Sequence, residues 1–274
     1  MTCLLARAAV AGVALALAAC HAAREVPSPA VGQWVWSARD AALLSASRAA
    51  RPGLHAAVWI GTLLRSGARV VTQLGEPPTI DSGGAPTRVI RLDDSLHPLL
   101  DSLPTDSLAA LVGPRLAALL AVAQGAQTNY SVQLDYDAPV RLLPHWAALL
   151  RALRRGALAG HSVWITSLLV HVEQPHYGRW FGGAADGHVL QLFDTQLEYS
   201  STLQSRVEHA IAQAGLPCAI GLAAYEREGA NGRLSQHRAW LPWAAKAARS
   251  GRITALWIFP AGTPYLPLLS SVGL

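Results

Sequence analysis

The chain has 274 residues, its formal net charge is +5, and 51% of its residues are hydrophobic. A chain of this length can bury a full hydrophobic core. The positive charge is spread over dispersed arginines, Lys246 is the only lysine, and no long basic stripe with interleaved aromatic residues is present. This distribution excludes nucleic acid as an expected partner.

Residues 1–19 have the pattern of a secretory signal peptide. Arg7 is the only charged side chain before an apolar run that ends at Ala19, and the run is shorter than the roughly 20 residues that span a bilayer. Leu17-Ala18-Ala19-Cys20 resembles the lipobox of bacterial lipoproteins, which implies cleavage before Cys20 and lipid on its sulfur. The alternative is an ordinary signal peptide cut near Ala19. Because His21 is not an aspartate, the resemblance further implies a cell-envelope protein anchored to the outer membrane and facing the periplasm.

Residues 20–30 are predicted to be a tether, and residues 31–274 a single domain of about the length of one (β/α)-barrel, typically about 250 residues. No later segment is predicted to cross a membrane, so the lipid would be the only membrane attachment. Cys218 is the one cysteine left for the domain, since Cys3 leaves with the signal and Cys20 carries lipid. Neither an intramolecular disulfide nor a cysteine metal cluster is expected, and Cys218 is interpreted as a small buried hydrophobe.

Eight short apolar segments follow the tether, and helical patterns lie between most of them, which favours a parallel sheet closed into a TIM-type (β/α)8 barrel. The predicted strands are Gln33–Trp36, Leu54–Ile60, Thr87–Leu92, Ser131–Tyr136, Ser162–Leu169, His188–Phe193, Pro217–Ala223 and Ile253–Phe259. The predicted helices are Ala38–Ala50, Ser107–Gln124, Pro144–Arg155, Leu203–Ala214 and Ala239–Ala248. Four of these helices are followed by glycine, namely Gly125, Gly156, Gly215 and Gly251.

The barrel is expected to be somewhat irregular. Gly67–Leu74 is an extra extended segment before the third strand, and Pro264 and Pro267 leave little room for a full last helix. A doubly wound open sheet is the alternative fold, but no Gly-x-Gly-x-x-Gly or Walker turn follows any strand.

The fourth predicted strand carries the main candidate site. Successive side chains of a strand point to opposite faces, so Gln133, Asp135 and Asp137 share one face and the apolar residues between them share the other. In a barrel, a polar face that points inward brings its last residues to the C-terminal mouth. Two carboxylates at this spacing repel, so one pKa should rise, which suits a general acid. Structural roles are the alternative: Asp137 could cap the helix after Pro139, and either acid could pair with an arginine.

Three further acids follow other strands and would converge on the same mouth: Glu173, Asp194 and Glu226. Two carboxylates around an oxocarbenium-like transition state are the usual apparatus of glycosidic hydrolysis. The alternative for each of the three, which is favoured when the residue is taken alone, is a surface or ion-paired acid.

Tryptophans lie near the mouth ends of three strands and could bind sugar faces or fill the core: Trp36, Trp59 and Trp257. Trp164, earlier in its strand, is expected to fill the core. The histidines lack metal-ligand spacing, and no Gly-x-Ser-x-Gly turn is present, so neither a metal nor a cofactor is expected.

Four segments, in this order, resemble a bacterial family of exported proteins known only as a domain of unknown function, with a barrel related to glycosidases that include the family 18 chitinases. They are Gln33-Trp34-Val35-Trp36, Val89-Ile90-Arg91-Leu92, Gln133-Leu134-Asp135-Tyr136-Asp137-Ala138 and Trp164-Ile165-Thr166-Ser167-Leu168. In those chitinases the fourth strand ends in Asp-x-Asp-x-Glu. Asp135 and Asp137 match its two aspartates, whereas Pro139 stands where its catalytic glutamate would be.

The sequence therefore predicts a cell-envelope lipoprotein whose barrel hydrolyses a glycan with carboxylates at strand ends. Asp135 and Asp137 would act with Glu173, Asp194 or Glu226, and sugars would contact Gln133 and the three mouth tryptophans. The alternative is a barrel that binds a glycan or serves as a scaffold without catalysis, which the loss of the chitinase glutamate favours. A carbohydrate ligand is the expected partner.

Overall fold

The computed structural model describes residues 30–75, 86–123, 130–193, 199–225 and 237–274. The predicted signal peptide and all but the last residue of the tether lie outside the described residues, and their assignment stays a prediction. Residue 30, which was assigned to the tether, is the first residue of a strand.

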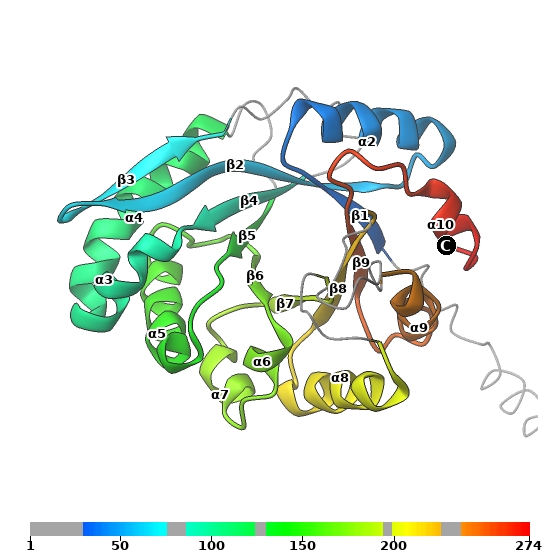
Figure 1. Ribbon diagram of the computed structural model, residues 1–274. Coiled ribbons are helices and arrows are strands. Elements are labelled where there is room, and N and C mark those ends of the chain that lie inside the picture. Colours follow the sequence, from blue (N-terminus) through cyan, green and yellow to red (C-terminus); the bar gives the residue numbers. More distant parts are fainter. Residues whose placement is uncertain (1–29, 76–85, 124–129, 194–198, 226–236) are drawn as a thin grey trace, which may run out of the picture.

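Eight parallel strands close into a barrel, because the first strand pairs with both the last strand and the second. Helices surround the strands (Figure 1). The barrel strands are β1 (Ala30–Val35), β2 (His55–Ser66), β4 (Thr87–Leu92), β5 (Ser131–Asp135), β6 (Val163–Ser167), β7 (Gly187–Gln191), β8 (Cys218–Ala223) and β9 (Ala255–Phe259). All eight predicted strands are confirmed, and the alternative of an open sheet is wrong.

The five predicted helices are present with slightly different ends. They are α2 (Ala38–Ala50), α4 (Thr105–Ala123), α5 (Leu143–Arg154), α8 (Ser201–Ala214) and α9 (His237–Arg249). Short helices that periodicity could not predict fill the connections: η1 (Asp94–Leu96), α3 (His97–Ser102), η2 (Val140–Leu142), α6 (Leu169–Val172), α7 (Tyr177–Phe181) and α10 (Leu266–Ser270). The five-residue α10, with Pro267 near its start, confirms the shortened last helix.

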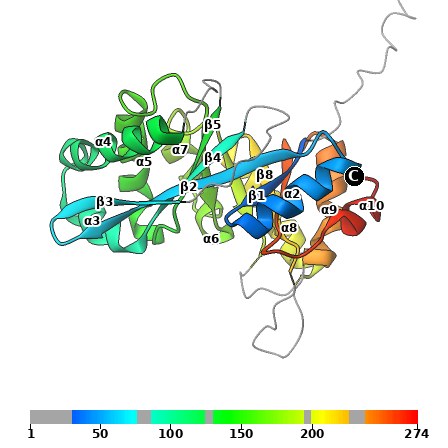
Figure 2. The ribbon, with the colours of Figure 1, turned by 90° about the horizontal axis from the view of Figure 1, so that it is seen from above.

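The extra extended segment is β3 (Arg69–Leu74), which pairs antiparallel with the outer half of β2. This hairpin projects beyond the barrel in both views (Figure 1, Figure 2). Helix α4 packs against β2, β3 and α5. Its segment Thr105–Val122 is long and apolar enough to cross a membrane by length and composition, so the prediction that no segment after the signal peptide has this length and composition is wrong. The buried residues make up 28% of this segment, and those with apolar side chains pack into the core between the strands and the helices.

Each strand sends alternate side chains to two separate cores. The larger core lies between strands and helices and includes Val132, Leu134 and Tyr136. The smaller core fills the barrel interior, where Trp164 packs as expected. A side chain at Gly32 would have its Cβ 2.3 Å from the ring of Trp257, so glycine there makes room for a tryptophan inside the barrel. Bulky rings inside the barrel thus close it below the mouth.

A buried hydrogen-bond network ties β1 to the segment after β9. The Gln33 side chain donates to the carbonyl oxygen of Asp40 at 2.7 Å, and the Tyr265 hydroxyl donates to Gln33 Oε1 at 2.7 Å. The carboxylate of Asp40 accepts from the backbone N–H of Gly262 at 2.9 Å. The two ends of the barrel sequence are therefore fastened together next to the mouth.

Candidate functional site

A cavity of about 360 Å³ opens at the C-terminal mouth of the barrel. One part of its wall is polar and charged, and the rest is mainly aromatic. The lining residues are Trp34, Trp36, Arg91, Gln133, Asp135, Asp137, Leu168, Gln191, Phe193 and Phe259. They come from the ends of six strands or from the residues that directly follow them, which is where barrel enzymes carry their sites.

Asp135 is the last residue of β5 and is only 9% exposed. Burial raises the pKa of its carboxyl to about 6, and the neighbouring negative charge of Asp137 adds to the rise. A hydrogen bond from Thr166 and the positive charge of Arg91 act in the opposite direction. Near neutrality this carboxyl is therefore poised between its two protonation states, as a general acid or base must be.

Asp137 lies two residues further on, and its side chain is exposed at the mouth. Desolvation by the surrounding protein still raises the pKa of this carboxyl, while the charge of Arg91 opposes the rise. The helix η2 has Pro139 as its N-cap and receives no side-chain cap, so the predicted capping role of Asp137 is wrong.

An aromatic wall faces the acids. Trp36 stacks on Trp59 with ring centroids 5.6 Å apart, and Phe259 meets Trp36 edge-on at 6.2 Å. Phe193 stacks on Phe259 at 5.6 Å and meets Trp34 edge-on. These rings give the cavity a broad apolar face.

Gln133 lies at the floor, with both ends of its amide group already bonded. Its Oε1 accepts from the indole N–H of Trp34 at 3.1 Å, and its Nε2 donates to Thr166 Oγ1 at 3.0 Å. The predicted contact of Gln133 with a sugar stays untested, but its principal polar partners are protein groups.

The structure brings four of the predicted site residues into one cavity: Asp135, Asp137, Trp36 and Gln133. Trp59 and Trp257 are not among the residues that line the cavity; they stack on Trp36 and Trp34, which do line it, at 5.6 and 6.2 Å. Asp194 and Glu226 lie outside the described residues.

Glu173 does not line the cavity either. It follows α6, and its two carboxylate oxygens accept from Nε and Nη2 of Arg206 on α8 at 2.9 and 3.0 Å. The structure therefore places it in an ion pair of the helical shell, which was the structural alternative for this residue.

Six lining residues were not predicted: Trp34, Arg91, Leu168, Gln191, Phe193 and Phe259. A signal for some of them was present. Trp34 has the same parity as Trp36, and Phe259 has the same parity as Trp257, so a period of two would have placed each pair on one face.

His171, at the segment after β6, has a structural role. It is 3% exposed, and burial lowers its pKa to about 4 although a hydrogen bond with the backbone of Ala138 opposes this. Its Nδ1 accepts from the backbone N–H of Leu168 at 3.2 Å. His171 thus joins the segments after β5 and β6, both of which border the cavity.

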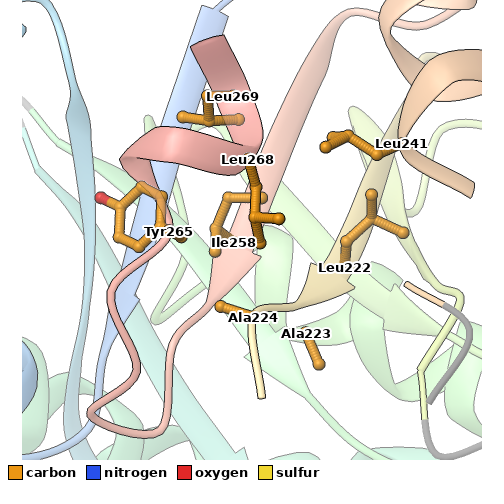
Figure 3. Close-up of a pocket in the computed structure, with 8 residues that line it drawn as sticks. All are labelled: Leu222, Ala223, Ala224, Leu241, Ile258, Tyr265, Leu268 and Leu269. Carbon is orange, nitrogen blue, oxygen red and sulfur yellow. The ribbon is translucent and has the colours of Figure 1, made fainter. Parts of the chain in front are cut away.

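A second, much smaller pocket lies between β8, β9, α9 and α10 (Figure 3). Its volume of about 10 Å³ holds at most one water molecule, and its lining is almost entirely apolar. In the described ranges, no group of three His, Cys, Asp or Glu side chains could hold a metal ion.

Solved structures share the fold at low sequence identity. The spore cortex-lytic enzyme SleL of Bacillus cereus has a TM-score of 0.57 and 12% identity, over 89% of this chain and 74% of that one. A GH18 chitinase from Pseudoalteromonas aurantia has a TM-score of 0.55 and 12% identity, and the match covers 88% of this chain and 99% of that one. A xylanase-α-amylase inhibitor protein in complex with trehalose has a TM-score of 0.52 and 15% identity, and the match covers 89% of this chain and 97% of that one.

No family model matches the chain, and no curated protein does. The structural matches confirm the expected closed (β/α)8 barrel. Because that fold is shared by two enzymes and by an enzyme inhibitor, the fold alone does not assign a function to this chain.

Proposed function

We propose that the cavity at the barrel mouth binds a carbohydrate chain. The observation that carries the proposal is an aromatic wall opposite two carboxylates and two amide side chains in one open cavity. Aromatic faces pack against the C–H faces of sugar rings, while carboxylates and amides can hydrogen-bond sugar hydroxyls.

Hydrolysis is the further function proposed for this site, and the raised pKa of Asp135 supports it. In this mechanism Asp135 donates its proton to the glycosidic oxygen as the bond to the anomeric carbon breaks. Asp137, at the exposed edge, accepts a proton from the water that attacks that carbon. Binding without cleavage is the competing function, because Pro139 stands where the resemblance expects the glutamate.

A panel of soluble chito-oligosaccharides, cello-oligosaccharides and peptidoglycan fragments tests the two proposals in order. Calorimetric titration measures binding, and release of new reducing ends measures cleavage. Binding by wild type that is weakened in Trp36→Ala supports the carbohydrate site, and binding of no member of the panel contradicts it. Cleavage that is lost in Asp135→Asn or Asp137→Asn supports hydrolysis. Binding without release of reducing ends supports the competing function.

We also propose that the protein is a lipoprotein of the cell envelope, attached through Cys20 to the outer membrane. The lipobox-like Leu17-Ala18-Ala19-Cys20 after an apolar run supports this. Fractionation of the native host should place the protein in outer membranes, and Cys20→Ser should release it or stall its processing. Normal processing and membrane retention of Cys20→Ser would contradict the anchor.

A further inference from the structure

We infer that the glycan bound at the barrel mouth carries a free ammonium group, held between the carboxylates of Asp135 and Asp137 and the aromatic wall. The inference rests on the proposed function, because it names the chemical class of the sugar that the same cavity takes. It adds a positive charge to the ligand, whereas the proposed function requires only a sugar ring.

The charged groups of the cavity wall are unequal in number. Asp135 and Asp137 contribute two carboxylates, and Arg91 is the one cationic side chain among the described residues that line the cavity. The ion pairs between described residues involve other acids, so neither carboxylate has a described cation in direct contact. Arg91 neighbours Asp135 in the register of β4 and β5, yet it forms no ion pair with it. A ligand with a positive charge would supply the contact that these carboxylates lack.

Asp135 carries most of the argument, because it is only 9% exposed and yet lines the cavity. A buried carboxylate is normally paired with a cation. The charge of Arg91 lowers the pKa of both mouth acids less than burial and the neighbouring acids raise it, and Asp94 outweighs His97 in its effect on Asp137. An ammonium group that donates hydrogen bonds to these carboxylates would favour their ionised forms.

The aromatic wall provides a second kind of contact for the same charge. Trp36, Phe193 and Phe259 line the cavity and are each only partly buried. The face of an aromatic ring attracts a cation that lies within about 6 Å of its centre, and it also packs against the C–H face of a sugar. A wall of rings opposite unpaired carboxylates therefore suits a sugar ring that bears an ammonium group.

An anionic sugar is the opposite alternative, since Arg91 could pair with a carboxylate or phosphate of the ligand. Such a ligand would meet two carboxylates for one guanidinium in the same cavity, and like charges repel. A neutral N-acetylated sugar would avoid this repulsion but would gain nothing from the unpaired carboxylates. The positive ligand is therefore favoured over both.

Three tetrasaccharides of different charge test the inference by calorimetric titration of the full chain at about pH 6, below the ordinary pKa of an amine. The chitosan tetramer carries ammonium groups, the chitin tetramer has the same backbone with neutral N-acetyl groups, and tetragalacturonate carries carboxylates. We expect the chitosan tetramer to bind about tenfold more tightly than the chitin tetramer, and tetragalacturonate to bind most weakly.

Two variants that each remove one charge should change the affinity for the chitosan tetramer in opposite directions. Asp137→Asn should weaken binding about fivefold, and Arg91→Gln should strengthen it by a similar factor. Both should keep the affinity for the chitin tetramer within about threefold of wild type, since the new amides still form hydrogen bonds. Glu173→Gln is the matched control, because it removes a carboxylate outside the cavity, and it should leave all three affinities unchanged.

Two results would overturn the inference and leave the carbohydrate site intact. One is binding of the chitin tetramer or tetragalacturonate at least as tight as that of the chitosan tetramer. The other is a change of chitosan affinity in the same direction in Asp137→Asn and Arg91→Gln, since loss of structure weakens binding in both. Failure of all three tetrasaccharides to bind would also overturn it, and the proposed function fails with it only if cello-oligosaccharides and peptidoglycan fragments do not bind either.

Discussion

Asp135 and Asp137 at the barrel mouth differ in what surrounds their carboxylates from two acids outside the mouth, Asp186 directly before β7 and Glu208 on α8, which we call the shell acids. Burial would raise the pKa of Asp186, but hydrogen bonds from Arg154 at 2.9 Å and from the backbone N–H of Val163 at 2.7 Å lower it overall. The pKa of Glu208 is also lowered, chiefly by a hydrogen bond from Trp243 and more weakly by hydrogen bonds from Arg252 and Gln204.

At the mouth the direction is reversed, since the pKa of both Asp135 and Asp137 is raised. The shell uses ionised carboxylates to hold helices and strands together, and the mouth keeps two acids where ionisation is unfavourable. Groups whose pKa is perturbed by burial and a like charge in an open cavity are typical of functional sites.

Asp135→Asn should give the largest effects, a gain in stability at high pH and a loss of oligosaccharide binding or cleavage. Since the folded-state pKa of about 6 lies above the ordinary value of 3.8, the folded protein binds this proton more tightly than the unfolded chain does. The contribution of Asp135 to stability therefore falls as pH rises through this window, and ionisation costs up to about 3 kcal/mol at higher pH. Thermal unfolding should show Asp135→Asn more stable than wild type at about pH 8, with the difference vanishing near pH 4.

The same variant should weaken oligosaccharide binding or abolish cleavage. A variant that is destabilised by about 1–3 kcal/mol at high pH, with binding intact, would make Asp135 a framework residue like the shell acids. The proposed difference in role between the acids at the mouth and the shell acids would then be contradicted.

Trp36→Ala tests the wall that faces the acids. Loss of its ring should weaken oligosaccharide affinity about tenfold, or 1.4 kcal/mol, as measured by calorimetry. Trp180→Ala is the matched control, because Trp180 is a partly buried tryptophan on α7 outside the cavity. Equal losses in the two variants would show a general loss of structure rather than a sugar contact.

Asp186→Asn should have the opposite stability effect to Asp135→Asn. It weakens the bonds to Arg154 and to the start of β6, so unfolding at about pH 7 should show a loss of about 1 kcal/mol. Because the folded-state pKa of Asp186 is lowered, its contribution is present above the unfolded pKa and is lost as pH falls through the folded value. The deficit should therefore shrink in acid, and a stabilised variant would contradict the assignment to the shell.

Glu173→Gln should have the smallest effect. Its partner Arg206 is half-exposed, and exposed ion pairs contribute about 0–1 kcal/mol, so chemical unfolding should show little change. Oligosaccharide binding and cleavage should match wild type. Loss of cleavage in a stable Glu173→Gln protein would restore the sequence-based prediction that this acid takes part in hydrolysis.

Much of the fold was predictable because each strand is a local signal. Short apolar segments between glycine-stopped helices predicted all eight barrel strands, and a period of two placed Gln133, Asp135 and Asp137 on the inner face. Both the apolar segments and the period of two are patterns of residues close together in the sequence. They can therefore be recognised without knowledge of the long-range contacts in the barrel.

The rest of the site depended on partners far apart in the sequence. Glu173 pairs with Arg206, 33 residues later, and Gln133 bonds Trp34, 99 residues earlier. No spacing rule predicts which acid forms an ion pair with an arginine. Nor does one predict whether a tryptophan such as Trp257 lies at the mouth or one layer below it. Those outcomes are decided by the packing of rings against strand glycines inside the barrel.

The direction of β1 determines how an attached barrel would be oriented. The strand enters the barrel at Ala30, at the end opposite the cavity, and runs toward the mouth. Any attachment through the chain before Ala30 would therefore hold the protein by its closed end. Its opening would face away from the attachment surface, toward polymers that lie at a distance from it, and the length of chain before Ala30 would set how far the opening reaches.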